Sequence, residues 1–469
     1  MPNCNFEASI YGIHIKFTER FLNMEIKLPE QVNRALELLH DSGFEAYAVG
    51  GCVRDIIMGR SPGDFDITTS ALPGETKRVF AGFKIIETGI KHGTISVVID
   101  GESLEITTYR VDGAYSDGRH PDVVSFSKNL AEDLKRRDFT INAMAFNHEE
   151  GLIDLFDGIG DIQRKVIKCV GNADRRFEED SLRILRALRF ASVLGFEIED
   201  NTLKAAFKNR SRLRLVSAER IGEELLKLVA GMDVRRVLTE NIEILGEIIP
   251  ELLPMRGFEQ KNPHHIYDVL EHTAAAVEAT PADVTLRLAA LFHDIGKPLS
   301  FSLDENGTGH FYGHAEKSAG MTDDIMRRLR FGNDIRNNVV MLVRFHDRQI
   351  ELEERAVKRV LNKLGEAGFS QLLELKTADN MAQAPEYSFR REHYSHLKEI
   401  YEKIIGEKSC FSVKDLEIDG NDVMEAGIKQ GPEVGRILDR LLDDVIEGRI
   451  SNEREELVAE IEKTVKKQA

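Results

Sequence analysis

Hydrophobic positions recur at helical spacing in several parts of this chain. Val32, Leu36 and Leu39 are three or four residues apart and follow a proline, a residue that favours the start of a helix. Residues 262–379 read as mainly helical, and apolar positions between residues 438 and 445 predict an amphipathic helix near the C-terminus. We therefore expect the second half of the chain to be mainly helical.

Strand patterns gather in the first third of the chain. Residues 46–49 form a short apolar run, and residues 64–68 read as a second strand. Residues 94–100 and 104–109 are rich in β-branched residues on either side of Gly101-Glu102, which predicts a hairpin. A sheet followed by helices places the chain in the α+β class.

Composition adds bounds to this picture. A length of 469 residues predicts about two to four domains, and 42% hydrophobic with 30% charged residues is typical of a soluble, core-forming chain. No apolar run approaches the ~18 residues of a membrane span, so we expect no membrane partner. The four cysteines are scattered and form no C-x-x-C pair, which fits the reducing cytoplasm.

The first residues look detached from the rest of the chain. Residues 1–23 mix aromatic, polar and charged residues without a clear period, and Met24 then opens the first helical segment. Two interpretations stay open: residues 1–23 are an extension upstream of a natural start at Met24, or they form a short strand or arm.

The first candidate chemistry follows the apolar run at residues 46–49. Gly50-Gly51 separates this run from residues 52–59, which read as a helix that ends at a glycine. Such a turn can aim free backbone N–H groups at an anion, although many turns between a strand and a helix also contain two glycines.

Two aspartates come next. Asp64 and Asp66 share one face if residues 64–68 form a strand. Two carboxylates on one face repel each other unless a cation lies between them, and a hard divalent ion such as Mg²⁺ suits both carboxylates and phosphates. Glu105 is a candidate third carboxylate. The alternatives are a solvated edge strand for the aspartates and an exposed strand position for Glu105.

A family resemblance becomes clear over about residues 24–230. Six stretches occur in this order: GGCVRDIIMG, DFDITTSALP, TTYRVDGAYSDGRHPDVVSF, DLKRRDFTINAMAF, DLFDGIGDI and EEDSLRILRALRFASVLGFEI. Together they resemble the class II tRNA nucleotidyltransferases, which are the CCA-adding enzymes and bacterial poly(A) polymerases. The resemblance implies a mixed-sheet, polymerase-beta-like head, a helical neck and template-independent transfer of nucleotides to an RNA 3′ end.

The resemblance also implies roles for single residues at the matched positions. They are metal binding for Asp64 and Asp66, triphosphate binding for Gly50, Gly51 and Arg54, and ribose recognition for Arg137 and Asp138. The polar stretch between Tyr109 and Arg137 is similar to a segment of CCA-adding enzymes that helps the change from C to A addition. Its alternative interpretation is an ordinary surface loop.

The neck offers a way to recognise bases. The pattern predicts that Glu179 and Asp180 open a helix that carries Arg183, Arg186 and Arg189, so Asp180 and Arg183 would be neighbours on one face. A carboxylate accepts from the amino group of cytosine or adenine, and an arginine donates to the adjacent ring nitrogen. The matched family positions carry base recognition. The alternative is a capping acid followed by a solvated basic stripe.

Charge is distributed unevenly. The formal net charge of −17 argues against indiscriminate coating of nucleic acid but does not exclude a local basic surface. Residues 175–220 hold eleven Lys and Arg against seven Asp and Glu, and phosphate binding needs such a local surplus. In this interval Ser217, Glu219 and Arg220 match a family motif that we interpret as structural.

A second candidate site lies in the helical segment 262–379. Imidazole and carboxylate side chains at several helices suit a divalent transition metal. One predicted set is His272, His293, Asp294 and Asp379, and adding His314 and His346 completes a two-metal set. This order resembles the HD-superfamily metal-dependent phosphohydrolases over about 120 residues, which implies hydrolysis of phosphate esters by a metal-activated water.

Two further residues belong to this prediction. Lys297 either binds a substrate phosphate or donates a proton, or it is a solvated lysine. His265 is two helical turns before His272, so we expect both on one helix face and interpret His265 as a supporting group or proton donor. A decayed, non-catalytic HD domain stays open as an alternative.

The C-terminal part carries no catalytic pattern. It resembles the tail of the transferase family, which is expected to hold the body of tRNA, but residues 411–469 contain nine Lys and Arg against 15 Asp and Glu. A closing helical bundle is the alternative. The predicted domains are an extension (1–23), head (24–170), neck (171–255), HD domain (256–385) and tail (386–469).

The leading hypothesis is a CCA-adding tRNA nucleotidyltransferase with CTP, ATP and the tRNA 3′ end as partners. Mg²⁺ would act at the head, and a divalent transition metal at the HD site would support repair of damaged RNA ends. A poly(A) polymerase or an enzyme that adds only A is the nearest competitor. A phosphohydrolase whose head only binds RNA is the competitor from another class.

Overall fold

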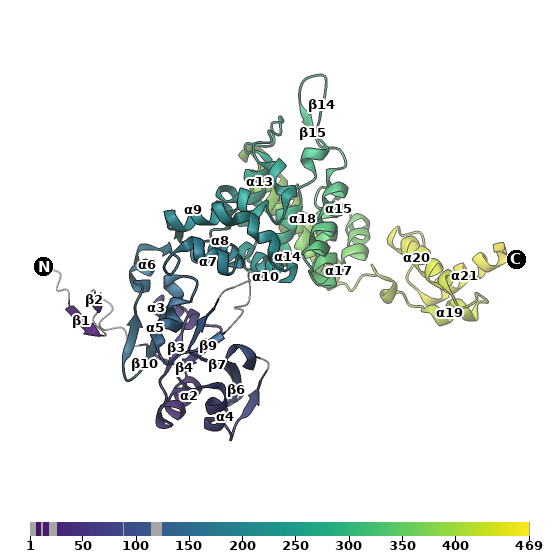
Figure 1. Ribbon diagram of the computed structural model, residues 1–469. Coiled ribbons are helices and arrows are strands. Elements are labelled where there is room, and N and C mark those ends of the chain that lie inside the picture. The colour runs from purple at the N-terminus through teal and green to yellow at the C-terminus, as the bar shows by residue number, and fades with distance from the viewer. Residues whose placement is uncertain (1–5, 11–12, 18–25, 88, 114–123, 469) are drawn as a thin grey trace. The chain divides into compact units, whose positions relative to one another are not determined.

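The computed structural model describes residues 6–10, 13–17, 26–87, 89–113 and 124–468. It contains two compact units, one made of residues 1–233 with 243–248 and the other of residues 234–242 with 249–469 (Figure 1). Each unit is described by itself below. Across the described residues, no helix is long and apolar enough to cross a membrane.

The predicted extension is covered only in part. Strands β1 (Phe6–Ile10) and β2 (Ile13–Phe17) pair antiparallel to each other. The other positions among residues 1–23 lie outside the described part of the chain, as does Met24. The choice between an upstream extension and an arm therefore stays a prediction.

A seven-stranded mixed sheet forms the head of the first unit. The strand order is β11-β10-β3-β4-β7-β6-β5, with β4 and β7 parallel and the other neighbours antiparallel. This confirms the mixed-sheet head. The strands are β3 (Ala46–Val49), β4 (Asp66–Thr69), β5 (Lys84–Ile86), β6 (Thr94–Ile99), β7 (Glu102–Thr108), β10 (Met144–Asn147) and β11 (Gly151–Asp154).

Two strand boundaries differ from the prediction. Asp64 is not part of β4, because Val49, the last residue of β3, already pairs with Asp66 and the chain then enters the glycine turn. The hairpin between β6 and β7 turns at Asp100 and Gly101, which both have positive φ, while Glu102 is already a strand residue. Both differences reflect pairing across the sheet, which the local pattern does not contain.

Further strand pairs and helices accompany this sheet in the first unit. Strands β8 (Arg110–Asp112) and β9 (Val124–Phe126) form a separate antiparallel pair, and residues 114–123 between them lie outside the described residues. Two short strands, β12 (Val166–Ile167) and β13 (Glu197–Ile198), pair in parallel within the neck. The head helices are α2 (Glu30–Asp41), α3 (Gly51–Ile57), α4 (Pro73–Val79), α5 (Leu130–Lys135) and α6 (Gly158–Arg164).

The neck helices begin differently from the prediction. Asp180 has the extended backbone angles φ −142° and ψ 104°, so it separates two helices and does not lie inside one. The predicted helix start at Glu179 is wrong because an earlier helix ends there. The neck helices are α7 (Ala173–Glu179), α8 (Leu182–Leu194), α9 (Asp200–Asn209) and α10 (Ala218–Val229), and α10 packs along α8.

The second unit is helical, as its pattern predicted. A short hairpin of β14 (Ser302–Leu303) and β15 (Gly309–His310) interrupts it, and Gly365 introduces a kink in the longest helix. The helices of its first part are α11 (Val234–Glu240), α13 (Val269–Ala279), α14 (Val284–Phe292), α15 (His314–Arg328), α16 (Asn333–Phe345), α17 (Glu354–Met381) and α18 (Arg390–Gly406). The short α12 (Ile242–Leu245) lies where the chain passes between the units.

The last part of the chain forms a small bundle with its own core. Helices α19 (Gly420–Glu425), α20 (Pro432–Ile446) and α21 (Arg454–Gln468) follow one another. Leu441 and Leu442 of α20 pack with Val423, Leu457 and Ile461, and all five are fully buried. The amphipathic helix expected near residues 438–445 is therefore present and faces this core.

Candidate active sites

Three carboxylates meet where β4 begins. Asp66 is directly opposite Glu105 in the parallel pairing of β4 and β7, and Asp64 precedes Asp66 by two residues. Removal of water by the surrounding head raises the pKa of Asp66 to about 6 against the opposing charge of Arg137, and Asp64 and Glu105 add to the rise. A divalent cation would relieve this repulsion, so the residues present fit a metal ion.

The glycine turn brings an arginine close to these carboxylates. Gly50 has φ +85° and ψ −130°, a conformation that side chains rarely adopt. A Cβ atom at this position would lie 2.9 Å from Nη1 of Arg137. Glycine is therefore needed here both for the backbone angle and for the close approach of the guanidinium group.

Replacing Gly50 with alanine tests this close approach. We expect Gly50→Ala to lower nucleotide addition more than about tenfold, because displacing Arg137 removes its charge-assisted contact with the nucleotide. The free energy of unfolding should also fall by about 1–2 kcal/mol, because alanine is strained at this positive φ. Gly59→Ala is the matched control, since Gly59 has φ +70° but no atom within 4 Å of the added carbon. Addition rates and melting temperatures of both variants give the measurement. Equal loss of activity in both would contradict a specific effect on Arg137.

Three arginines gather around one phenylalanine in the second half of α8. The guanidinium carbons of Arg54, Arg186 and Arg189 lie 5.1, 5.5 and 4.0 Å from the ring centroid of Phe190. Arg54 also donates from Nη1 to Oδ1 of Asn142 at 2.6 Å. Burial and the charge of Arg186 lower the pKa of Arg189 to about 10. This concentration of positive charge suits a polyanion such as a triphosphate.

Buried acids hold these arginines in place. Oδ2 of Asp138 accepts from Nε of Arg186 at 2.8 Å, and its Oδ1 accepts from the Phe139 N–H and from Asn142 Nδ2. Burial opposes ionisation, but Arg186 keeps the pKa of Asp138 well below its usual value. Glu224 of α10 lies 3.0 Å from Arg189. Both oxygens of Asp138 are engaged in positioning neighbours, and its ribose contact stays a prediction.

The side chains of the two residues predicted to read the base are held by different partners. Asp180 accepts from Nη2 of Arg220 at 2.7 Å, whereas Arg183 donates to Glu179 at 2.8 Å and to the Arg136 carbonyl at 3.1 Å. The expected shared helix face is wrong because Asp180 lies between α7 and α8 and has an extended backbone. Arg220 was missed as a contact of this site, since only the packing of α10 on α8 brings it to a residue forty positions earlier.

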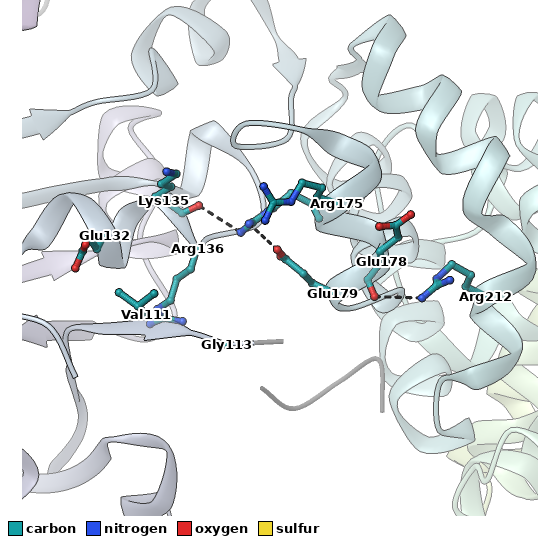
Figure 2. Close-up of a pocket in the computed structure, with 10 residues that line it drawn as sticks. Val111, Gly113, Glu132, Lys135, Arg136, Arg175, Glu178, Glu179 and Arg212 are labelled. Carbon is teal, nitrogen blue, oxygen red and sulfur yellow. Dashed lines mark hydrogen bonds and ion pairs between the residues drawn. The ribbon is translucent and has the colours of Figure 1, made fainter. Parts of the chain in front are cut away.

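A pocket of about 770 Å³ borders this region (Figure 2). Arg176 donates to the Lys135 carbonyl at 3.3 Å and to Glu179 at 2.7 Å, and Arg212 donates to the Glu178 carbonyl. The lining contains more cationic than acidic side chains, which favours an anionic occupant. Its residues are Val111, Gly113, Glu132, Lys135, Arg136, Arg175, Arg176, Glu178, Glu179 and Arg212.

The predicted HD residues of the second unit do come together. Two groups of ligand atoms, each within 4.8 Å of one another, share Asp294. One group adds His272 and His293, and the other adds His314 and His346; all five residues are buried. Asp379 of α17 joins the first group, with Oδ1 2.9 Å from Nε2 of His272.

The four imidazoles are all oriented in the same way. Each Nδ1 lies 2.6–3.2 Å from a backbone carbonyl oxygen, which fixes Nδ1 as the donor and leaves Nε2 turned inward. The inward Nε2 atoms of His314 and His346 are 3.1 Å apart. Burial opposes ionisation of Asp294, but His293 and Lys297 keep its pKa well below the usual value. Inward Nε2 atoms around a shared carboxylate fit two metal ions.

Lys297 and His265 lie beside this cluster. Lys297 is buried, with Nζ 2.7 Å from Asp294 Oδ2 and 2.8 Å from Gln260 Oε1, so it is not a solvated lysine. His265 precedes α13, so the expected shared helix face is wrong, yet its ring centroid is 4.8 Å from that of His272. Burial and Lys297 lower the pKa of His265 to about 2. The catalytic roles of both residues stay predictions.

Family models match three parts of the chain. The model described as "Poly A polymerase head domain" matches residues 46–168, and "Probable RNA and SrmB- binding site of polymerase A" matches residues 195–253. "tRNA nucleotidyltransferase domain 2 putative" matches residues 314–461, across the boundary predicted at residue 385. Together with the mixed sheet and the carboxylates at β4, these matches define the chain as a nucleotidyltransferase.

Curated relatives narrow the class. The CCA-adding enzyme of Lactobacillus delbrueckii subsp. bulgaricus is 37% identical over 423 residues, which cover 90% of this chain and 94% of the relative. That of Lactobacillus helveticus is 33% identical over 433 residues, covering 91% and 96%. This chain belongs to the family of the CCA-adding enzymes, and membership implies a divalent metal ion at the head site.

Solved structures share this architecture. The Bacillus stearothermophilus CCA-adding enzyme, solved in complex with CTP, matches with a TM-score of 0.68 and 28% identity, covering 94% of this chain and 98% of that one. The Thermotoga maritima CCA-adding enzyme, solved with tRNA, shares the fold at a TM-score of 0.56 and 19% identity, covering 93% and 96%.

Proposed function

We propose that this protein adds C, C and A to the 3′ end of tRNA from CTP and ATP without a nucleic-acid template. The observation that carries the proposal is the meeting of Asp64, Asp66 and Glu105 beside the Gly50 turn and Arg137. Relatives named CCA-adding enzymes, one of them solved with CTP, support the choice of substrates. The cytoplasm, where tRNA and ATP are available, is the compartment that we propose.

Each group of the head has a separate task in this reaction. Mg²⁺ held by Asp64 and Asp66, with Glu105 beside them, would neutralise the triphosphate and favour loss of a proton from the RNA 3′-hydroxyl. Arg54 and Arg137 bind phosphate oxygens, and Gly50 leaves room for that contact. The 3′-oxygen bonds to the α-phosphorus, and the bond to the departing pyrophosphate breaks.

The two candidate base-reading residues are each oriented by a neighbour. Arg220 orients Asp180 and Glu179 orients Arg183, and an incoming base would bind to the side chains in these positions. The pocket of Figure 2 shares Glu179 and lies next to this point, which supports a path for the anionic RNA 3′ end.

Arg220 is the residue to change for a test of base reading. We expect Arg220→Gln to raise the KM for CTP and ATP about tenfold, because Asp180 loses the bidentate contact that orients it. Misincorporation of UTP and GTP should rise relative to CTP and ATP. Arg214→Gln is the control, since Arg214 is exposed and pairs with Glu247. A uniform fall in kcat without a change in base preference would speak for a purely structural contact.

A single assay separates CCA addition from its nearest competitor. Transfer RNAs that lack A, CA or CCA are incubated with CTP and ATP supplied separately. We expect C to be incorporated on tRNA that lacks CCA, and A only after both C residues. Incorporation of A alone, on every substrate, would point to a poly(A) polymerase or an A-adding enzyme.

A second function is favoured by the second unit. We propose that the cluster around Asp294 binds two divalent transition metal ions and hydrolyses phosphate esters at RNA ends, in support of end repair. The shared carboxylate and the four inward Nε2 atoms carry this proposal. Bound metal ions would supply a nucleophilic water for attack on phosphorus. Lys297, held at Asp294, is placed to bind a phosphate oxygen.

A further inference from the structure

The rim of the Asp294 cluster carries a guanidinium group without a carboxylate partner. Arg390 is the first residue of α18, and its side chain is half buried. Its Nη1 donates to Oε1 of Gln383 at 3.2 Å, and the described part of the chain offers it no ion pair. A half-buried cation next to neutral groups loses hydration without a compensating charge. An anionic ligand would supply that charge.

A chain of two hydrogen bonds links this guanidinium to a proposed metal ligand. Nε2 of Gln383 donates to Oδ2 of Asp379 at 3.2 Å, while Oε1 of the same amide accepts from Arg390. Arg390 is therefore connected to Asp379 through the amide side chain of Gln383. A phosphate ester bound at the proposed metal ions would lie near Asp379, and Arg390 is placed to contact a neighbouring phosphate of a polynucleotide strand.

Aromatic rings flank the same guanidinium. The guanidinium carbon of Arg390 is 5.3 Å from the ring centroid of Tyr387, whose ring meets that of His264 at 4.2 Å. The His264 carbonyl accepts from the Ala384 N–H at 2.9 Å, which ties the segment before α13 to the segment before α18. An arginine beside a tyrosine is the combination that binds single strands by phosphate contact and base stacking.

We propose that Arg390, Tyr387 and His264 form a nucleotide-binding rim, and that this rim directs the metal cluster to polynucleotide ends in preference to small phosphate esters. The inference rests on the proposed phosphohydrolase function and adds the residues that select its substrate. Tyr387 and Arg390 fall in the predicted tail, which begins at residue 386, whereas His264 falls in the predicted HD domain. Helix α18 nevertheless packs against α17, which carries Asp379.

The test compares two substrates in the full chain loaded with metal. The substrates are an oligoribonucleotide with a 3′-phosphate and p-nitrophenyl phosphate, which has no second phosphate. For Arg390→Gln, we expect the ratio of kcat/KM on the oligonucleotide to kcat/KM on the small ester to fall by about tenfold or more, the value of one charge-assisted contact. Arg391→Gln is the matched control, because Arg391 is exposed and donates to the Ser388 carbonyl.

Two further measurements separate binding from a structural role. Loss of one phosphate contact should reduce the slope of log KM for the oligonucleotide against log salt by about 0.7. Metal content should equal that of the unmodified protein, and Arg390→Lys should recover part of the lost ratio because it restores the charge. An unchanged ratio, or an equal loss on both substrates, overturns the proposal. Failure of the unmodified protein on both substrates would instead refute the phosphohydrolase function itself.

Discussion

Replacement of Asp66 by alanine should abolish nucleotide addition, with an expected loss of about a thousandfold or more. Asp66 is the first residue of β4 and lies directly opposite Glu105. Its removal would leave only the carboxylates of Asp64 and Glu105 to bind the metal ion. Metal ions contribute several kcal/mol to transition states of this kind, and each 1.4 kcal/mol is about tenfold in rate. Single-turnover addition of C to tRNA that lacks CCA gives the measurement.

The control for this change lies on the neighbouring strand. Glu102 begins β7 on the exposed hairpin, three residues before Glu105, so Glu102→Gln changes an acid of the same strand away from the site. We expect Glu102→Gln to keep full addition and Glu105→Gln to lose part of it. If Asp66→Ala still adds nucleotides at a normal rate, the metal assignment to the head is wrong.

Removal of the Asp294 carboxylate should abolish phosphohydrolysis and leave nucleotide addition largely intact. Asp294 belongs to both groups of ligand atoms, so Asp294→Ala should remove both metal ions at once. His272→Ala and His346→Ala should each remove only one, because each histidine belongs to a single group. Metal content by mass spectrometry and release of phosphate from an RNA 3′-phosphate give the two readouts.

The reciprocal pair of variants provides the internal control. Asp66→Ala should retain phosphohydrolysis, and Asp294→Ala should retain addition, since the two clusters lie in different compact units. Asp379→Asn keeps the size of its side chain and gives a second test where Asp294→Ala fails to fold. Metal binding with undiminished stoichiometry in Asp294→Ala would contradict a shared ligand.

Local sequence was sufficient to predict those structural elements that one short segment specifies by itself. The strand at residues 46–49 and the helix with Val32, Leu36 and Leu39 appear as their patterns predicted, because hydrophobic period acts over a few positions. The hairpin of β6 and β7 is also present, with its turn shifted by one residue. The order of histidines and aspartates also predicted which side chains lie together in the second unit, since their types match one kind of metal site.

Long-range pairing decided what those patterns left open. The pairing of Val49 with Asp66 makes β4 begin at Asp66 and leaves Asp64 outside the strand. The extended backbone of Asp180 places it between α7 and α8, outside the helix that carries Arg183. Packing of α10 on α8 joins Asp180 to Arg220, a contact that no periodicity contains.

The amino-acid sequence by itself determined the class of chemistry, the residues that could perform it and the α+β order of the parts. Only the tertiary structure decided which of those residues meet, because ion pairs such as Asp138 with Arg186 form between segments whose spacing along the chain carries no signal. The same holds for the role proposed for Arg390, which depends on the hydrogen bonds that connect it to Asp379 through Gln383.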